Sequence, residues 1–397
     1  MTTQELIATS NKYLANTYAR FPMVLVRGRG VRLWDSDGKE YLDCVGGIAV
    51  DALGHCHPKM VEAIRAQAET LIHVSNLYHI EPQIRLAQLL CEQSFADRAF
   101  FCNSGAEANE AAIKLARKYA KDHWNSDRVD IITMHHAFHG RTLATVTATG
   151  NPKYQHGFEP LMPGFKHVPY DNLQAVERAI DSRTCAVLVE PVQGEGGVNV
   201  PSADYLPGLR RLCDEAGILL ILDEVQSGMG RTGKLFAYQH WGVEPDILTL
   251  AKALAGGIPM GAMLAREAVA ASFVPGTHAS TFGGTPFVSA VAVAVVTTML
   301  EDDLPGNAAR VGKYFLDRLQ GLQAAYPVIK AVRGKGLILG VEVSVPARGI
   351  VAACMERGLL VLTAGDNVVR FVPPLILTEG DADQAVAILE AALKSLP

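Results

Sequence analysis

The sequence predicts an α/β protein with a mostly parallel sheet, and three observations support that prediction. Segments typical of strands and of helices alternate from about residue 98 to residue 252, which implies right-handed crossovers between parallel strands. The strand segments are short apolar runs without polar alternation, as expected for strands buried on both faces. The length of 397 residues fits one large and one small domain.

Two of the apolar runs deliver charged side chains to one end of the predicted sheet. The run Ile218–Leu222 ends at Asp223, and the run Ile247–Leu250 is followed closely by Lys252. Ligands of open α/β sheets bind beyond the carboxyl ends of the strands, so this acid and this lysine could hold opposite sides of one ligand. Small residues around Lys252 leave the room that an amine needs to form a Schiff base. The ordinary alternatives are a turn cap for Asp223 and a solvated helix start for Lys252.

Composition and charge exclude several classes of function. The chain is 49% hydrophobic and 19% charged, which supports a large core and argues against disorder. Its net charge of −5, without a basic block, argues against nucleic acid as the main partner. Seven cysteines without a Cys-x-x-Cys pair are typical of buried thiols in a reducing cytosol. Met1–Leu6 lacks a signal-peptide pattern and Phe287–Val296 is too short to span a membrane, so we expect a cytoplasmic protein.

The first part of the chain carries strand-like pieces and then a helix. Met23–Val26 and Val31–Trp34 flank two glycines, and the turn signal at 36–39 predicts a small hairpin or meander. A glycine-rich connection leads into a helix near Lys59–Thr70. The preceding His-Cys-His at 55–57 raises the question of a metal site, but no second ligand pair follows closely. We therefore prefer a helix entry that a histidine caps.

The first strand-to-helix turn of the large domain suits an anion. Arg98–Cys102 is a predicted strand, followed by a helix to about Ala120. Ser104 is a good N-cap, and Glu107 three residues later completes a capping box. The small residues after Ser104 let a ligand approach the first-turn N–H groups, which favour phosphate. The alternative is a helix that is merely well capped.

The next strand, Asp130–Met134, leads into a loop rich in histidine. His135 and His139 have helical metal-ligand spacing, but Gly140 and the preceding strand favour a loop, which removes that geometry. Phe138 could stack on a flat cofactor ring, and Arg141 could bind a carboxylate through two hydrogen bonds. A core phenylalanine and a surface arginine are the alternatives.

Further elements complete the two domains. Glu195 lies in a glycine-rich loop after the strand Cys185–Val189, which resembles a site loop. Val288–Leu300 alternates like a strand, but its length and the preceding Pro286 favour a buried helix. The remaining predicted elements are a helix at Ser202–Ala216 stopped by Gly217, a strand at Met260–Ala265, helices at Ala308–Ala325, Ala347–Arg357 and from Asp381, and strands at Gly336–Val343, Leu359–Leu362 and Val368–Phe371.

Taken together, these residues resemble the class III pyridoxal-phosphate aminotransferases, the ornithine aminotransferase subgroup, from Arg27 to about residue 390. The family's fold-type I architecture implies a large domain with a mostly parallel seven-stranded sheet between helices, plus a smaller α+β domain. We place the large domain at 46–300 and the small one at 301–397, with 1–45 packing against the small domain. The motifs are NSGAEA at 103–108, FHGRT at 138–142, EPVQGEGG at 190–197, LDEVQSGMGRTG at 222–233, AKAL at 251–254, STFGG at 280–284 and VVRFVPP at 368–374.

The resemblance implies roles on the cofactor pyridoxal 5′-phosphate. Lys252 would link covalently to the cofactor and move protons, and Asp223 would pair with the pyridinium nitrogen, so these two are the expected catalytic residues. The other implied cofactor contacts are Gln226 on the phenolic oxygen, Phe138 on the ring face, Ser104, Gly105 and Ala106 on the phosphate, and Thr281 on the phosphate from the second subunit of a homodimer.

The resemblance also implies how substrates are held. Arg141 would bind the α-carboxylate, whereas a strand-edge arginine is the alternative for Arg370. Glu195 and Arg370 resemble a gating pair, because a dicarboxylate needs a second cation that the amino donor must not meet. The family usually has Asn where this chain has Thr285, at a local turn near the phosphate. Ser280 and Asn76 complete the implied substrate contacts.

Within the class, the motifs at 47–58 and 73–79 are most similar to those of enzymes that act on N-acetylornithine. The implied ping-pong reaction moves the terminal amino group of N2-acetylornithine to 2-oxoglutarate, giving N-acetylglutamate 5-semialdehyde and glutamate in arginine biosynthesis. Succinylornithine, ornithine and 4-aminobutyrate are alternative donors. A metal hydrolase using His135, His136 and His139 is a distant alternative from another class; the reading chosen here requires no metal.

Overall fold

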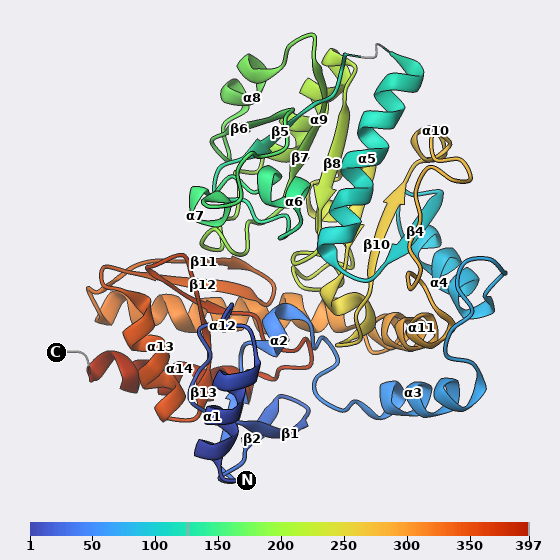
Figure 1. The fold of residues 1–397 in the computed structure, drawn as a ribbon. Coiled ribbons are helices and arrows are strands. Elements are labelled where there is room, and N and C mark those ends of the chain that lie inside the picture. Colours follow the sequence, from blue (N-terminus) through green and yellow to red (C-terminus); the bar gives the residue numbers. More distant parts are fainter. Residues whose placement is uncertain (125–126, 396–397) are drawn as a thin grey trace.

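The computed structural model describes residues 1–124 and 127–395, and its centre is a seven-stranded sheet (Figure 1). The strands lie in the order β4-β10-β9-β8-β7-β5-β6. Strand β10 runs antiparallel to β4 and β9, and the other neighbours are parallel, so the mostly parallel α/β sheet is confirmed. The bounds are β4 Arg98–Cys102, β5 Asp130–Met134, β6 Phe165–Val168, β7 Thr184–Val189, β8 Leu219–Asp223, β9 Ile247–Leu250 and β10 Gly261–Ala265.

The central strands β8 and β9 are buried along their whole length. Their apolar runs lack alternation because helices cover both faces of the sheet, so neither face meets water. The two strands pair in parallel, Asp223 opposite Thr249, which places their carboxyl ends at the same edge. That edge is where the sequence delivers Asp223 and Lys252.

Helices cover the large sheet, with α5 (Gly105–His123) running along it directly after β4 (Figure 1). Helix α11 (Pro286–Glu301) packs against α3 (Pro58–Thr70) and α4 (Glu81–Glu92), and its burial explains why its sequence is almost wholly apolar. The remaining helices here are α2 Gly46–Ala49, α6 Leu143–Ala148, α7 Pro152–Gln155, α8 Leu173–Ala179, α9 Tyr205–Ala216 and α10 Glu267–Ala270, with short 3₁₀ helices η1 Ala237–His240 and η2 Lys252–Ala255.

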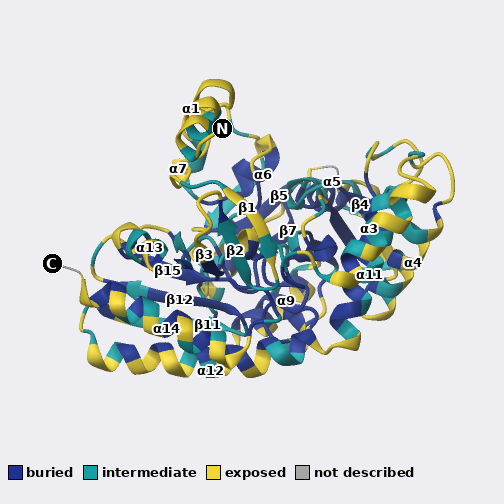
Figure 2. Cartoon of the chain, turned by 90° about the horizontal axis from the view of Figure 1, so that it is seen from below, coloured by how far each residue is buried: buried dark blue, intermediate teal, exposed yellow. Residues whose placement is uncertain are grey.

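The C-terminal part forms a second sheet, ordered β11-β12-β15-β14. Exposed and buried residues alternate along α12 and α14, as expected for helices with one face on a core (Figure 2). The bounds are β11 Ile329–Lys335, β12 Ile338–Val343, β14 Leu362–Ala364, β15 Val368–Phe371, α12 Leu304–Ala325, α13 Ala347–Glu356 and α14 Glu379–Lys394.

The N-terminal strands form a third sheet, ordered β1-β2-β3-β13, in which β3 pairs in parallel with a C-terminal strand. Arg32 of this sheet also pairs with Asp381 at 2.8 Å. The domain boundaries given above stay a prediction. The bounds are α1 Thr3–Tyr13, β1 Leu25–Arg29, β2 Arg32–Asp35, β3 Glu40–Asp43 and β13 Leu359–Leu360.

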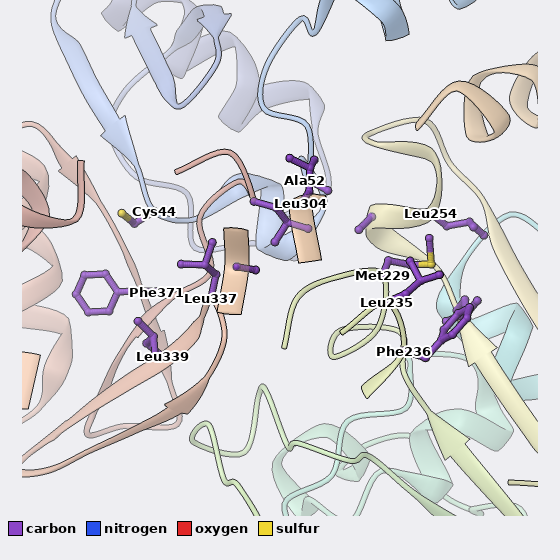
Figure 3. Close-up of a cluster of buried hydrophobic side chains, with 14 of the residues drawn as sticks. Cys44, Ala52, Met229, Leu235, Phe236, Leu254, Leu304, Leu337, Leu339 and Phe371 are labelled. Carbon is purple, nitrogen blue, oxygen red and sulfur yellow. The ribbon is translucent and has the colours of Figure 1, made fainter. Parts of the chain in front are cut away.

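One hydrophobic cluster joins the large and C-terminal sheets (Figure 3). Leu337 and Phe371 contribute from the C-terminal side, and Met229 and Phe236 from the loop after β8. Leu304, at the start of α12, belongs to the same cluster. This continuous packing fixes the loops after β8 against the C-terminal sheet. Among the described residues, no helix is long and apolar enough to cross a lipid bilayer.

Several predicted boundaries were wrong. Strand β1 runs through Gly28 instead of ending before it, because Gly28 and Arg29 pair with Leu33 and Arg32 of β2. A side chain at Gly28 would clash there, since an added Cβ would lie 2.7 Å from the His55 Cβ. The predicted strand at 359–362 is two strands in different sheets, since the chain crosses between sheets at Val361. The prediction for 336–343 merged a turn with β12. The elements α1, α4, α6, α7, α8, α10, β6 and β11 were not predicted.

Candidate active site

A hollow of about 430 Å³ opens at the edge of the large sheet where the parallel strands end. Segments that follow five strands, β4, β5, β7, β8 and β9, line it. It therefore occupies the position at which open α/β sheets bind ligands. Of the predicted site residues, it brings together Ser104, Gly105, Ala106, Phe138, Arg141, Glu195, Asp223, Gln226 and Lys252.

Asp223 is held as a buried carboxylate by a polar network. Its Oδ2 accepts hydrogen bonds from His139 Nδ1 and Asn109 Nδ2, each at 2.7 Å, and its Oδ1 accepts from Val225 N at 3.0 Å. Burial acts to raise the pKa of this carboxyl, but the hydrogen bonds, first that from His139, hold it below its ordinary value. Within residues 1–124 and 127–395, no Lys or Arg forms an ion pair with Asp223. The carboxylate therefore suits a cationic group in the hollow.

Lys252 is half-buried and lies at the start of η2. Its backbone adopts φ 46°, in the left-handed region, which costs a non-glycine residue on the order of 1 kcal/mol. Burial lowers the pKa of its amine, with Glu195 and Asp223 opposing that shift. Its Nζ makes no hydrogen bond to another described residue. A buried amine with a lowered pKa spends more time neutral, which is the nucleophilic form.

The start of α5 presents unpaired N–H groups to the hollow. The Ser104 Oγ accepts a hydrogen bond from Glu107 N at 3.2 Å, so the predicted N-cap is confirmed. The reciprocal half of the predicted capping box is wrong, because the Glu107 carboxylate accepts from the Asn103 N–H at 2.8 Å instead. The first-turn N–H groups of Gly105 and Ala106 have no partner among the described residues, which suits an anion.

Phe138 and Arg141 lie on the loop after β5, as predicted. The Phe138 ring packs edge-on to Tyr154, at 5.8 Å between centroids, and its N–H donates to Glu190 Oε1 at 2.9 Å. The Arg141 guanidinium is exposed and lies over the Tyr154 ring at 4.0 Å. Gly140, at φ 137°, allows this loop to approach α5, because an added Cβ would lie 2.8 Å from the Ala106 Cβ.

Glu195, Gln226 and Arg370 form one network. The Arg370 Nη1 donates to Glu195 Oε1 at 2.6 Å and to Gln226 Oε1 at 3.1 Å. The Gln226 amide in turn donates to Glu195 at 3.2 Å. Burial raises the pKa of Glu195, but Arg370 brings it below the ordinary value, so the pair is ionic. Arg370 comes from β15, so the C-terminal sheet supplies a cation to the large domain's hollow.

Four predicted residues lie outside the lining of this hollow in the single chain. Asn76 donates to the carbonyls of Ser280 and Gly283, at 3.1 and 2.9 Å, and so fixes the loop at 280–283. Thr281 on that loop is exposed. Arg370, the fourth, meets the lining through Glu195 and Gln226. Thr285, at the point where the family usually has Asn, caps α11 by accepting from Val288 N.

The histidines do not converge on a metal. His139 turns its Nδ1 to Asp223, whereas His135 stacks on His167 at 6.2 Å. In the described part of the chain, the one group close enough to hold an ion is Asp43, Asp51 and His55. The predicted histidine cap of α3 is also wrong, because the His57 side chain makes no capping hydrogen bond.

The sequence did not predict the polar residues that hold Asp223 in place. Asn109 accepts from Thr249 Oγ1 at 2.8 Å and donates to the His139 carbonyl at 2.8 Å. Glu190 is also buried at the hollow, and burial raises the pKa of its carboxyl to about 7. Thr249 is the one polar residue of β9, and Asn109 is the one polar residue that α5 buries; that isolation among apolar residues is the signal that could have identified them.

The geometry fits a flat, phosphorylated ring that carries a protonatable nitrogen. The phosphate would meet the first-turn N–H groups of α5, and the ring nitrogen would meet the Asp223 carboxylate, with which no described Lys or Arg forms an ion pair. Lys252 supplies an amine that lines the hollow and has no hydrogen-bond partner among the described residues. This fit rests on the chain's own geometry: N–H groups at the start of α5 without a partner among the described residues, and a carboxylate held in its ionised form.

Comparisons with known proteins give one consistent family. The family model for aminotransferase class-III matches residues 13–393. The acetylornithine aminotransferase of Caldanaerobacter subterraneus is 52% identical over 392 residues, covering 98% of this chain and all of the relative. That of Methanocaldococcus jannaschii is 50% identical over 393 residues and covers 98% of each chain. A Toxoplasma gondii ornithine aminotransferase structure, with partial occupancy of PLP at its active site, has a TM-score of 0.95 and 36% identity over 99% of this chain and 94% of that one.

Proposed function

The chain belongs to the class III aminotransferases, which depend on pyridoxal 5′-phosphate, and on this premise we propose that it transfers the terminal amino group of N2-acetylornithine to 2-oxoglutarate. The relatives named for acetylornithine match over nearly their full length at about half identity, which supports this donor. The Glu195–Arg370 ion pair carries the proposal for the acceptor. A dicarboxylate needs a second cation, and this one is kept neutralised until the acceptor arrives.

Each half-reaction makes a demand on this chain's residues. When bound, pyridoxal 5′-phosphate supplies an aldehyde that accepts the amino group and a ring that takes up electrons. Lys252 Nζ would take a proton from the carbon that bears the amino group and deliver it to the carbon that receives the amino group. Asp223 would keep the proton on the ring nitrogen, because its carboxylate is ionised and no described Lys or Arg forms an ion pair with it. Gln226 would hold the phenolic oxygen, and Phe138 would cover one ring face.

Substrate selection falls to three charged side chains. Arg141 is exposed at the mouth of the hollow and binds the α-carboxylate of either substrate. While the donor is bound, Glu195 holds Arg370 at 2.6 Å, so that the hollow offers no second free cation. When 2-oxoglutarate enters, its second carboxylate replaces Glu195 on Arg370. Ser280 and Asn76 shape the loop beside the site, through the hydrogen bond of Asn76 to the Ser280 carbonyl.

We also propose that the enzyme is a cytoplasmic homodimer in which Thr281 contacts the phosphate of the other subunit. Thr281 lies beside Phe282, whose side chain is 63% exposed. The Phe282 ring contacts His73 at 5.2 Å, which joins this loop to the segment before α4. A soluble monomer rarely exposes so many neighbouring apolar side chains. The exposed apolar residues of these two segments and α4 are Leu71, Ile72, Leu77, Tyr78, Ile84 and Phe282.

One kinetic comparison tests the proposed donor. We would measure kcat/KM with N2-acetylornithine, N2-succinylornithine, ornithine and 4-aminobutyrate, each with saturating 2-oxoglutarate. The proposal expects the highest value for N2-acetylornithine. A higher value for ornithine or 4-aminobutyrate would contradict it, and a higher value for succinylornithine would move the assignment to the other acylated donor.

A further inference from the structure

A second hollow, of about 520 Å³, lies at the end of the large sheet's strands opposite to the active site. It is bordered by the outer face of α5 and by the segments that enter β5, β6 and β7, including Val129, Gly164 and Arg183. These are the amino ends of the strands, whereas the active site lies at their carboxyl ends. The proposed transamination makes no use of this hollow.

The lining is strongly cationic in a protein whose net charge is −5. Lys114, Arg117, Lys118 and Lys121 are spaced three or four residues apart along α5, so they share one helix face. Arg183 adds a fifth cation, and Asp122 is the one acidic residue of the lining. A stripe of this kind is often only a solvated helix face. Here it borders a concave site, where low-dielectric walls focus the field on an anion.

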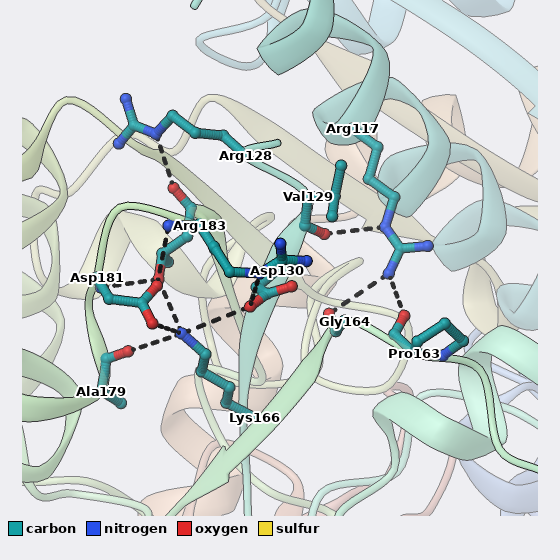
Figure 4. Close-up of polar contacts among 11 residues, drawn as sticks. Arg117, Arg128, Val129, Asp130, Pro163, Gly164, Lys166, Ala179, Asp181 and Arg183 are labelled. Atoms are coloured by element: carbon teal, nitrogen blue, oxygen red, sulfur yellow. Dashed lines mark hydrogen bonds and ion pairs between the residues drawn. The ribbon is translucent and has the colours of Figure 1, made fainter. Parts of the chain in front are cut away.

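Arg117 distinguishes this hollow from a solvated face. Its guanidinium is half-buried and is held by backbone carbonyls, with Nε donating to Val129 O at 3.0 Å and Nη2 to Pro163 O at 2.8 Å (Figure 4). Its Nη1 reaches only the Met162 sulfur, at 3.5 Å. Within the described residues no carboxylate accepts a hydrogen bond from Arg117. The protein thus fixes a cation in place and leaves its charge without a directly bound counter-ion.

The acids around the hollow are already paired. Asp122 forms an ion pair with Lys118 at 2.9 Å. Asp130 forms ion pairs with both Arg183, at 3.4 Å, and Lys166, at 3.6 Å (Figure 4). Lys121 forms no ion pair in the part of the chain that the structure describes. Lys114 Nζ donates a hydrogen bond to His278 Nδ1 at 2.8 Å, and not to a carboxylate. Three of the five cations therefore lack an acidic partner in direct contact.

We propose that this hollow binds a polyphosphate anion, free or as the polyphosphate chain of a nucleotide. Several adjacent phosphates match several cations spaced along one helix face, whereas a single carboxylate would leave most of them unpaired. The volume lies in the range of small-molecule sites, on the order of 300–1,000 Å³, and is too confined for a nucleic-acid duplex. Val129, Pro163 and Phe273 supply an apolar wall that a nucleoside could contact.

The test uses the holoenzyme, because the bound cofactor then occupies the phosphate site at the start of α5 and added anions cannot bind there. Isothermal titration with inorganic tripolyphosphate should show saturable binding that weakens as salt is raised. Lys114→Gln and Lys121→Gln remove exposed cations without emptying the core. Each should raise the Kd by about tenfold, the size of one charge-assisted contact, while kcat stays unchanged.

Lys313→Gln is the matched control. Lys313 is an exposed helical lysine, paired with Asp317 four residues on, and lies on α12. Its variant should bind tripolyphosphate as the wild type does. Absence of binding at millimolar tripolyphosphate, or equal affinity in all three variants, would overturn the proposal. Titration with ATP and with AMP separates the sources: tighter binding of ATP than of tripolyphosphate indicates a nucleotide, and weaker binding indicates the free anion.

Discussion

The Nδ1 atom of His139 lies 2.7 Å from the Oδ2 atom of Asp223, and both side chains are buried. The histidine lines the same hollow, and its hydrogen bond orients the carboxylate. Because both groups are removed from water, the hydrogen bond is stronger than an exposed one. The hydrogen bond from His139 thus helps to set the charge state of the Asp223 carboxylate.

Loss of that contact should produce a pH-dependent loss of stability. In the wild type the pKa of Asp223 is lower in the folded state than in the unfolded state. The ionised carboxylate therefore contributes fully to folding stability above its unfolded-state pKa, and this contribution is lost as the pH falls through its folded-state pKa. In His139→Leu, the hydrogen bond that lowers the Asp223 pKa is lost while burial still raises it. The ionised carboxylate then lowers the stability of the fold at neutral pH. We expect the apoenzyme to lose about 1.5–3 kcal/mol at pH 8 and less at pH 5. Thermal melting at both pH values measures this difference.

His139→Gln is the control for that prediction, because its amide can still donate to the carboxylate. It should recover part of the loss seen with His139→Leu at pH 8. An equal loss at pH 5 and pH 8 in the leucine variant would mean that only packing was removed.

Lys252→Ala should abolish turnover and the visible absorbance of the bound cofactor. No other amine lines the hollow among the described residues, so none can replace it. Absorbance spectra and steady-state rates measure the two effects, and retained turnover at a normal rate would refute the assignment. Lys335→Ala, a substitution of a half-buried lysine away from the hollow, should leave both properties unchanged.

Arg370→Gln should separate the two half-reactions. The acceptor half-reaction with 2-oxoglutarate should fall by about a hundredfold, because two charge-assisted hydrogen bonds to the second carboxylate are lost. The donor half-reaction should fall much less, since the donor does not meet this arginine. Single-turnover absorbance changes with each substrate alone measure the split, and an equal loss in both would argue against gating.

Glu195→Gln makes the reciprocal prediction. Without the Glu195 carboxylate, Arg370 loses its 2.6 Å ion pair and stays available to the second carboxylate of any substrate. Glutamate should then compete better against N2-acetylornithine than it does in the wild type. The ratio of kcat/KM values for the two donors measures this, and an unchanged ratio would count against the gating role.

Subunit complementation tests whether Thr281 acts across the dimer. Thr281→Ala and Lys252→Ala are each expected to impair activity. In a mixed dimer, the Lys252-containing site would receive Thr281 from the other chain and recover one working site. Co-expression with two affinity tags isolates the mixed dimer, and the absence of recovery would place Thr281 in its own subunit's site or in none.

Residues that act through local chemistry could be identified from the sequence. The unalternating runs before Asp223 and Lys252 predicted buried parallel strands, and strand order places their ends together. Ser104 predicted a helix start with free N–H groups, because capping depends on near neighbours in the chain. The motif resemblance then gave these positions a common ligand.

Contacts between distant segments were decided only by the tertiary structure. His139 and Asn109 lie 84 and 114 residues before Asp223, and nothing in their local sequence says that they meet it. The meeting of Arg370 with Glu195 across 175 residues requires the C-terminal sheet to dock on the large one. The unpartnered cations of α5 are likewise distinguished from a solvated face only by the walls that surround them. Local patterns record secondary structure and burial, whereas pairing across the chain depends on how packed elements are brought together in space.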